Sequence, residues 1–223
     1  MHMFSKRMLG GFAIVTGHLP IATGAAFTCK YTNAKDEISV CFFGDGAVAN
    51  GVFHESLNIA SMWELPCLYV LENNKWSMGT PLCRTMANYK NFPEKVAAAY
   101  GMEFFRLNGM DLLNCYAGFR EAHQHMLATR KPILIECITE RFRGHSISDP
   151  GLYRSKDEVK AILEQDPIIL MKNYCLKLGI LTEESMKQME SECRERVVEA
   201  VKQADSDPWP DPQELEKDVF VCN

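Results

Sequence analysis

The amino-acid sequence predicts an α/β fold in which a parallel sheet is flanked by helices. Four short apolar runs are typical of strands, and the segments between them carry apolar residues at three- and four-residue spacing, as helices do. Strands that alternate with helices form parallel sheets, because each helix returns the chain to the same end of the sheet. The apolar runs stop at Ile138, so a helical region without strands is expected to follow the sheet.

The expected elements alternate along the first part of the chain. The strands cover residues 38–43, 67–71, 103–107 and 133–138, and each is bounded by glycine, proline or charged residues. The helices cover residues 21–31, 52–63, 92–100 and 111–129. We therefore expect one α/β domain over residues 1–154 that holds a ligand site.

Residues 155–223 are expected to form a helical C-terminal region with an extended tail. Helical periodicity runs from Lys156 to about Ala204 without an apolar strand run. Prolines at alternate positions between Asp207 and Pro212 remove backbone donors and restrict the residues before them. This segment therefore cannot continue a helix.

Composition and charge exclude several classes of protein. Of the 223 residues, 47% are hydrophobic and 24% are charged, which is ordinary for a globular protein. The formal net charge of −5 leaves no general basic surface, so we expect no nucleic-acid partner. The longest apolar runs are far shorter than the roughly 20 residues of a membrane-spanning helix. Because residues 1–7 also lack a signal or transit pattern, the sequence favours a cytoplasmic protein without a membrane partner.

The nine cysteines do not indicate a metal or disulfide framework. None forms a Cys-x-x-Cys pair, and several, such as Cys41, Cys67 and Cys137, lie in apolar runs. Free cysteine in such a run behaves as a small hydrophobic residue. We therefore expect the cysteines to be buried and structural.

An acidic residue follows the first expected strand of the sheet. Asp45 stands between Gly44 and Gly46, at the carboxyl end of a strand, where open α/β sheets bind ligands. The glycines let backbone amides approach phosphate oxygens, and the carboxylate is a hard oxygen ligand of the kind Mg²⁺ prefers. Asp-Gly is also common turn chemistry, so the motif taken alone favours a plain turn.

A second polar element favours a ligand site over a plain turn. Asn74 follows the next strand, 29 residues after Asp45, which fits one strand–helix–strand unit. Two neighbouring parallel strands would then deliver a carboxylate and an amide oxygen to one crevice. The sequence therefore predicts a site for Mg²⁺ and a diphosphate at this end of the sheet.

The pair of motifs resembles the thiamine-diphosphate motif, and nearly the whole chain resembles the E1 α subunits of the thiamine-diphosphate-dependent 2-oxoacid dehydrogenase family, the pyruvate enzymes in particular. The similarity is densest in residues 44–47, 53–58, 65–66, 72–74 and 143–146. It implies thiamine diphosphate and Mg²⁺ as cofactors. By this resemblance Asp45, Asn74 and the backbone carbonyl of Trp76 ligate the metal, while Gly46 and Ala47, beside Gly44, contact the diphosphate.

The resemblance also assigns a role to the segment from Gly10 to Val15. Its counterpart in the family contacts the aminopyrimidine of the cofactor through the backbone, and Ala13 and Val15 occupy the corresponding places. Ala13 stands where the family more often has glycine. A plain helix-preceding turn is the alternative.

A polar loop from Arg141 to Pro150 follows the last strand and should open on the same crevice. The imidazole of His145 could donate to the diphosphate and move protons near neutral pH. The resemblance gives His145 this catalytic and cofactor-binding role, with a solvent-exposed loop histidine as the alternative. Ser146 occupies the position of a serine that is phosphorylated in mitochondrial relatives, and ordinary loop hydrogen bonding is equally compatible with it.

The resemblance implies an activity and its partners. Such an α subunit takes part in the oxidative decarboxylation of pyruvate and the transfer of the acetyl group to a lipoyl group. It does so with a β subunit in an α2β2 heterotetramer, docked to a lipoyl acyltransferase (E2) core. The β chain contributes the glutamate that contacts the aminopyrimidine. Family members carry a further N-terminal segment, so this chain corresponds to a fragment or to a shorter subunit.

Other readings stay open. The loop of residues 144–150 is more similar to pyruvate dehydrogenases than to branched-chain 2-oxoacid or acetoin dehydrogenases, which are the alternatives within the family. A truncated, non-catalytic assembly subunit is an alternative of another class. A phosphoryl-transfer enzyme that uses Asp45 with Mg²⁺ is disfavoured, because the sequence has no P-loop lysine.

Overall fold

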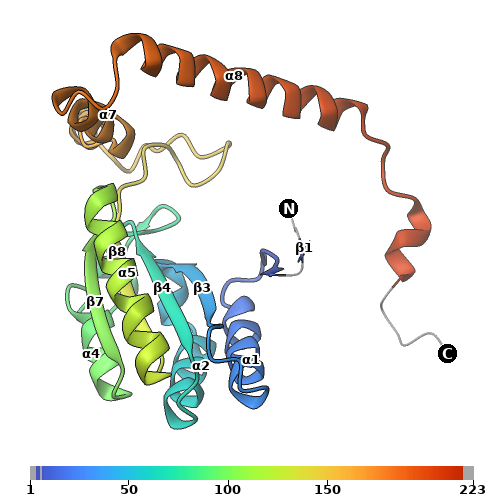
Figure 1. The fold of residues 1–223 in the computed structure, drawn as a ribbon. Helices are drawn as coiled ribbons and strands as arrows, with labels where there is room; N and C mark the ends of the chain where they lie inside the picture. The colour runs from blue at the N-terminus through green and yellow to red at the C-terminus, as the bar shows by residue number, and fades with distance from the viewer. Residues whose placement is uncertain (1–3, 6, 218–223) are drawn as a thin grey trace. The chain divides into compact units, whose positions relative to one another are not determined.

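A computed structural model describes residues 4–5 and 7–217, and its centre is a parallel sheet (Figure 1). The sheet has four strands in the order β3-β4-β8-β7, and every neighbouring pair is parallel. The strands are β3 (Ser39–Gly44), β4 (Cys67–Asn73), β7 (Glu103–Asn108) and β8 (Ile133–Ile138). Each coincides with an expected strand within two residues, so the predicted fold class is confirmed.

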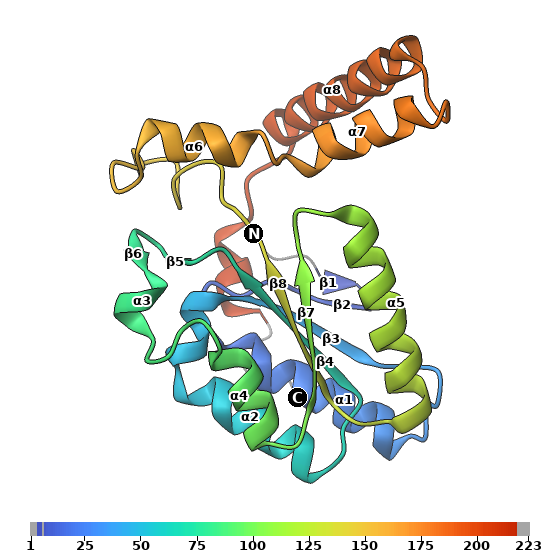
Figure 2. The ribbon, with the colours of Figure 1, turned by 90° about the vertical axis from the view of Figure 1, so that its left-hand side faces the viewer.

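Helices cover both faces of this sheet, as Figure 2 shows. One face carries α1 (His18–Tyr31), α2 (Gly51–Met62) and α4 (Phe92–Ala99), and the other carries α5 (Leu112–Thr129). The first face packs Phe43, Tyr69 and Leu71 against the helices, while the second packs Val70 and Ile135 against α5. The central strands are apolar on both faces because both are covered.

Local sequence signals set the ends of the helices. The side chain of Asn50 accepts a hydrogen bond from the Val52 amide at 3.0 Å and so caps the start of α2. Asp111 caps α5 in the same way, and Arg130 ends that helix in a left-handed conformation with φ 57°. As a result, α2 starts immediately after the turn that carries Asp45.

The structure also contains short elements that the periodicity did not predict. They are the paired strands β1 (Phe4–Ser5) and β2 (Met8–Leu9), the 3₁₀ turn η1 (Asp45–Ala49), the hairpin strands β5 (Trp76–Ser77) and β6 (Thr80–Pro81), and α3 (Leu82–Thr85). Elements of two to five residues are too short for a repeating apolar pattern. Two of them, η1 and the β5–β6 hairpin, extend the carboxyl ends of β3 and β4.

Three helices follow the sheet, as expected from the sequence. They are α6 (Lys156–Leu163), α7 (Pro167–Lys177) and α8 (Glu183–Ser206), and the 3₁₀ turn η2 (Pro212–Glu216) comes after them. The chain separates into two compact units, Met1–Leu170 and Met171–Asn223, with the division inside α7. The domain boundary after residue 154 stays a prediction.

In the part of the chain that is described, no helix is both long and apolar enough to cross a membrane. The expectation that the chain has no signal or transit pattern was based on residues 1–7. Of these, residues 1–3 and 6 lie outside the described residues.

The cysteines follow the expectation only in part. Cys41, Cys67, Cys137 and Cys175 are buried, and all the described cysteines are free thiols. Cys83 and Cys193 are exposed, and Cys29 and Cys115 are only partly buried, so the expectation of burial was wrong for these four. Cys83 lies in α3 and Cys193 in α8, and neither stands in an apolar strand run of the kind from which burial was expected. Cys222 lies outside the described residues.

Candidate active site

The carboxyl ends of β3 and β4 lie side by side and carry the two polar elements of the motif. Gly44 pairs with Glu72 in the parallel register, so the chain leaves both strands at the same level. Asp45 follows β3 directly and is 2% exposed, whereas Asn74 follows β4 and is half-buried. The structure thus brings together two residues that are distant in sequence. It also makes the Gly-Asp-Gly segment a turn, since η1 begins at Asp45.

The carboxylate of Asp45 lies in an unusual electrostatic environment. Burial raises its pKa from the ordinary 3.8 to about 6. The backbone amides of Gly46, Lys75 and Trp76 and the charge of Arg141 partly oppose this increase. Within the described residues, its buried Oδ2 atom has no hydrogen-bond partner. A buried carboxylate oxygen without a donor is costly unless a further cationic or donor group completes its surroundings.

The segment after β4 folds into a tight turn against this carboxylate. The Asn74 side-chain oxygen accepts a hydrogen bond from the Trp76 amide at 3.0 Å, and Asn73 accepts from the Lys75 amide at 3.0 Å. Lys75 is left-handed, with φ 69°, which turns its amide and the next one toward Asp45. An amide oxygen has two acceptor sites, so Asn74 keeps the capacity for a second ligand.

The glycines of the turn differ in their surroundings. A Cβ on Gly46 would lie 2.6 Å from the Ser77 Oγ atom, so the turn and β5 approach as closely as only glycine permits. A Cβ on Gly44 would meet nothing within 4 Å, which leaves open space beside the end of β3. Ala47 is buried. The backbone of Gly46 is therefore packed closely against β5, while the space beside Gly44 is open.

The described residues contain no group of three or more His, Cys, Asp or Glu side chains that could hold a metal ion. The oxygens of the predicted ligands are the carboxylate of Asp45, the side-chain amide of Asn74 and the backbone carbonyl of Trp76. Such a set suits a cation that takes its remaining ligands from a bound anion and water, as Mg²⁺ does with phosphates.

The loop that carries His145 is organised by one aspartate. The carboxylate of Asp149 accepts from the His145 amide at 2.7 Å, from the Gly151 amide at 2.8 Å and from the Tyr153 hydroxyl at 2.8 Å. These bonds hold the pKa of Asp149 near 2. The side chains of His145 and Ser146 are exposed, and the Ser146 hydroxyl lies 3.1 Å from that of Ser148. His145 is thus presented to solvent on an ordered backbone.

Aromatic and arginine contacts join this loop to the β5–β6 hairpin. The Trp76 and Tyr153 rings lie 4.8 Å apart between centroids. Arg141 donates to the Met78 carbonyl at 2.7 Å and to the Tyr153 hydroxyl at 2.6 Å. The buried Arg154 donates to the backbone carbonyls of Arg141 and Arg143. The hairpin therefore carries both Trp76, beside Asp45, and the contacts that hold the His145 loop.

Sequence reasoning missed these supporting residues. It treated Arg141, Asp149, Tyr153 and Arg154 as parts of a polar loop without assigning them a task. The available signal was the density of arginine, aspartate and tyrosine in a loop that contains two glycines. Such side chains can satisfy an irregular backbone that has no regular hydrogen-bond partners. The hydrogen-bond partners of these side chains could not be assigned without the fold.

The predicted residues of the N-terminal segment lie before α1. Ala13 and Val15 are exposed and belong to a turn that ends at Thr16, which has φ 72°. The His18 ring nitrogen Nε2 lies 2.8 Å from the Phe42 carbonyl oxygen. This contact places the turn next to the carboxyl end of β3, with the side chains of Ala13 and Val15 exposed and that of Thr16 buried.

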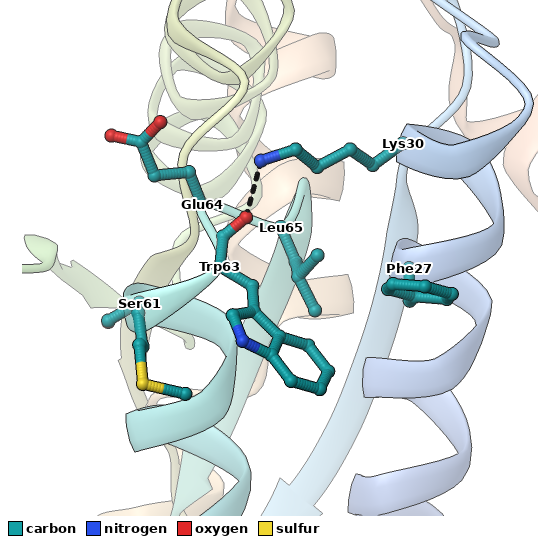
Figure 3. Close-up of a pocket in the computed structure, with 7 residues that line it drawn as sticks. Phe27, Lys30, Ser61, Trp63, Glu64 and Leu65 are labelled. Carbon is teal, nitrogen blue, oxygen red and sulfur yellow. Dashed lines mark hydrogen bonds between the residues drawn. The ribbon is translucent and has the colours of Figure 1, made fainter.

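A surface pocket lies away from these residues, between the carboxyl ends of α1 and α2 (Figure 3). The Lys30 amine donates to the Trp63 carbonyl at 2.6 Å there, and the Phe27 and Trp63 rings are 5.7 Å apart. Because residues 63–65 lead into the start of β4, the pocket belongs to the opposite end of the sheet. It includes none of the predicted site residues.

Comparison with known proteins assigns the chain to a family. The sequence model of the dehydrogenase E1 component family matches residues 1–213. The chain belongs to this family. The resemblance inferred from the two motifs is therefore confirmed, and so is the α/β fold expected from it.

Similar E1 chains come from bacteria and plants. The pyruvate dehydrogenase E1 component subunit alpha of Rhizobium meliloti (strain 1021) is 40% identical over 99% of this chain, and that of Rickettsia bellii (strain RML369-C) is 38% identical over 99%. The chloroplastic subunit alpha-3 of Oryza sativa subsp. japonica is 38% identical over 99%. The chain spans 64%, 68% and 54% of the lengths of these three relatives.

Proposed function

We propose that this chain is the α subunit of the E1 component of a pyruvate dehydrogenase complex. In this role it takes part in the thiamine-diphosphate-dependent oxidative decarboxylation of pyruvate and the transfer of the acetyl group to a lipoyl group. The observation that carries the proposal is the buried Asp45 carboxylate, whose Oδ2 atom lacks a partner within the described residues. Its place at the carboxyl end of β3, beside the Asn74 turn, is a ligand position in parallel α/β sheets.

The residues at this position fit Mg²⁺ with a diphosphate. Asp45 would supply the charged ligand, Asn74 a neutral side-chain oxygen and Trp76 a backbone carbonyl, while diphosphate oxygens and water would complete the shell. A cation would compensate the burial that raises the Asp45 pKa. Gly44, Gly46 and Ala47 lie in the turn between the two strands, where backbone amides could approach the phosphate oxygens.

The chain's own groups would position the cofactor and move protons beside it. Thiamine diphosphate, when bound, supplies the carbanion chemistry by which a 2-oxoacid loses carbon dioxide. His145 would donate to the diphosphate and transfer protons beside it, from a backbone that Asp149 holds in place. Ala13 and Val15 would contact the aminopyrimidine through their backbones.

The proposal includes partners and regulation. The working unit would be an α2β2 heterotetramer with a β chain, docked to a lipoyl acyltransferase (E2) core. The cytoplasmic location expected from the sequence stays a prediction. Ser146 is exposed on the same loop as His145. A phosphate there would place negative charge beside the cofactor diphosphate, which it would repel.

The test is a binding titration of the chain co-expressed with its β partner. Thiamine diphosphate is titrated in the presence of Mg²⁺, and the wild type is compared with Asp45→Ala and Asn74→Ala. Asp36→Ala is the matched control, because Asp36 is an exposed carboxylate before β3, at the other end of the sheet. We expect both site variants to lose binding and the control to keep it. Binding that survives both site substitutions would refute the site.

A second measurement addresses the substrate. Decarboxylation of pyruvate is compared with that of branched-chain 2-oxoacids and acetoin cleavage, with an artificial electron acceptor. Preference for pyruvate is expected. Preference for another substrate would reassign the chain within its family, whereas cofactor binding without turnover of any of them would indicate a non-catalytic assembly subunit.

A further inference from the structure

An ionic network around the buried Glu136 lies in the sheet directly beneath the Asn74 turn, and its cation, Arg106, is 38% exposed. Glu136, on β8, is 1% exposed although it interrupts an otherwise apolar strand. Its Oε2 atom accepts from the Arg106 Nε atom on β7 at 2.7 Å, and its Oε1 atom accepts from the Asn73 Nδ2 atom on β4 at 2.7 Å. The network therefore crosses three adjacent strands near their carboxyl ends.

The network continues from Asn73 into the turn. Asn73 is 6% exposed, and its Oδ1 atom accepts from the Lys75 amide at 3.0 Å. The amides of Lys75 and Trp76, with that of Gly46, face the Asp45 carboxylate. An unbroken path of hydrogen bonds thus leads from Arg106 through Glu136 and Asn73 to the backbone beside Asp45.

Stability alone does not account for a carboxylate at this place. The neighbouring side chains on the same face, Leu71 and Leu134, are fully buried, so packed apolar groups in place of the whole network would also suit this face. Replacing a buried ion pair by packed apolar groups is often neutral or stabilising, because desolvation of the charges offsets their attraction. What a leucine could not do is accept from Asn73 and so fix which way the Asn73 amide points.

The orientation of that amide decides the shape of the turn. With Nδ2 held by Glu136, Oδ1 must point toward the Lys75 amide, and Lys75 is held at φ 69°. This conformation is unfavourable for a residue with a side chain and persists only where surrounding contacts impose it. Glu136 thus acts on the turn through Asn73, without reaching the site itself.

We propose that Glu136 is a positioning residue for the cation and diphosphate site. It orients Asn73 so that the Lys75 and Trp76 amides and the Asn74 side chain take up their places around Asp45. This inference rests on the proposed function, since it concerns the affinity of the same site for Mg²⁺ and thiamine diphosphate. It adds a residue that contacts the turn through Asn73 and lies on β8, outside the β3–β4 pair.

A donor–acceptor swap tests this role. In Glu136→Gln the side chain keeps one acceptor, so with Arg106 satisfied its NH₂ group faces the NH₂ group of Asn73. If the Asn73 amide flips to relieve this, its NH₂ group then opposes the Lys75 amide. In the double variant Asn73→Asp with Glu136→Gln, the aspartate accepts from both sides and the network is complete again.

Two readouts separate positioning from general destabilisation. The first is the affinity for thiamine diphosphate with Mg²⁺ of the chain co-expressed with its β partner. We expect Glu136→Gln to weaken it about 10- to 100-fold, the usual effect of removing a residue that orients metal ligands. The second is amide hydrogen exchange at Lys75 and Trp76 without cofactor, which should become faster. The double variant should recover both toward wild type.

Tyr69→Phe is the matched control. Tyr69 lies on β4 and its buried hydroxyl is 2.6 Å from the Thr23 hydroxyl, so the variant loses a buried hydrogen bond of the same sheet away from the turn. Thermal unfolding is recorded for every variant. If Tyr69→Phe, at equal loss of stability, weakens cofactor binding as much as Glu136→Gln does, Glu136 has only a structural role.

Other outcomes are equally decisive. Wild-type affinity in Glu136→Gln, or a double variant that binds no better than Glu136→Gln, would overturn the positioning role while leaving the proposed function intact. If Glu136→Gln does not fold, the double variant carries the test. An affinity within a few fold of wild type supports the positioning role, and a weaker affinity overturns it. A wild-type chain that binds no cofactor at all would instead overturn the proposed function.

Discussion

Replacing Asp45 with asparagine should make the unliganded chain less sensitive to rising pH while abolishing Mg²⁺-dependent cofactor binding. The wild-type carboxylate is 2% exposed, and one of its oxygens has no partner within the described residues. Burial therefore raises its pKa from 3.8 to about 6. Asparagine has nearly the same shape but carries no charge at any pH, so it removes this pH-dependent term.

The magnitude follows from the change in pKa. The folded chain holds the Asp45 proton more tightly than the unfolded chain, so stability falls as the pH rises from about 3.8 to about 6, and the penalty is complete above that range. Because a tenfold change in proton affinity is worth about 1.4 kcal/mol, the full penalty is about 3 kcal/mol. Between about pH 4 and pH 7.5 most of it, roughly 2 kcal/mol, should appear.

Urea unfolding of both proteins near pH 4 and pH 7.5 measures this difference. The free energy of unfolding of the wild type should fall by roughly 2 kcal/mol more than that of Asp45→Asn between the two conditions. Terms that do not depend on pH, such as the desolvation of the new amide, cancel in this comparison. If the two proteins change in parallel, Asp45 is not a buried, destabilising charge and the electrostatic argument for a cation is wrong.

Three other measurements probe the same end of the sheet. Mg²⁺ binding in calorimetric titrations should weaken below about pH 6, where protonated Asp45 is no longer a ligand, and an affinity that is level down to about pH 5 would contradict this. Gly46→Ala should lower cofactor affinity roughly tenfold, because its Cβ would lie 2.6 Å from the Ser77 Oγ atom; Ser77→Ala should restore part of the loss, and no restoration would exclude the contact as the cause. Asp149→Asn keeps one acceptor for three donors, so trypsin should cleave the His145 loop faster, and an unchanged cleavage rate would show that other contacts order it.

The alternation of elements could be predicted because each strand and helix carries its own pattern. The runs at residues 67–71 and 133–138 are apolar on both sides because their strands are covered on both faces. The order of the strands could not be predicted in this way. β8 lies between β4 and β7, although β7 precedes it in sequence, and periodicity does not report which strands are neighbours.

The site could be predicted only where the sequence places chemistry at the end of a strand. Asp45 and Asn74 were found because strand ends and one strand–helix–strand spacing suffice to bring them together. Glu136 could not be found in this way, since its partners Asn73 and Arg106 are 63 and 30 residues away in sequence. The unusual pKa of Asp45 could not be predicted either, because it depends on burial by the folded turn.

The left-handed conformation of Lys75 has a consequence for how this part of the protein can change over evolution. At φ 69° the position suits glycine or asparagine as well as lysine, whereas valine and isoleucine would clash with their own backbone. The lysine side chain is half-exposed and pairs with Glu140, a contact that other residues could forgo at little loss. A substitution at this position therefore has to meet a requirement on backbone angles more than one on its functional group. The side chain in such a turn can therefore be replaced while the backbone geometry stays the same.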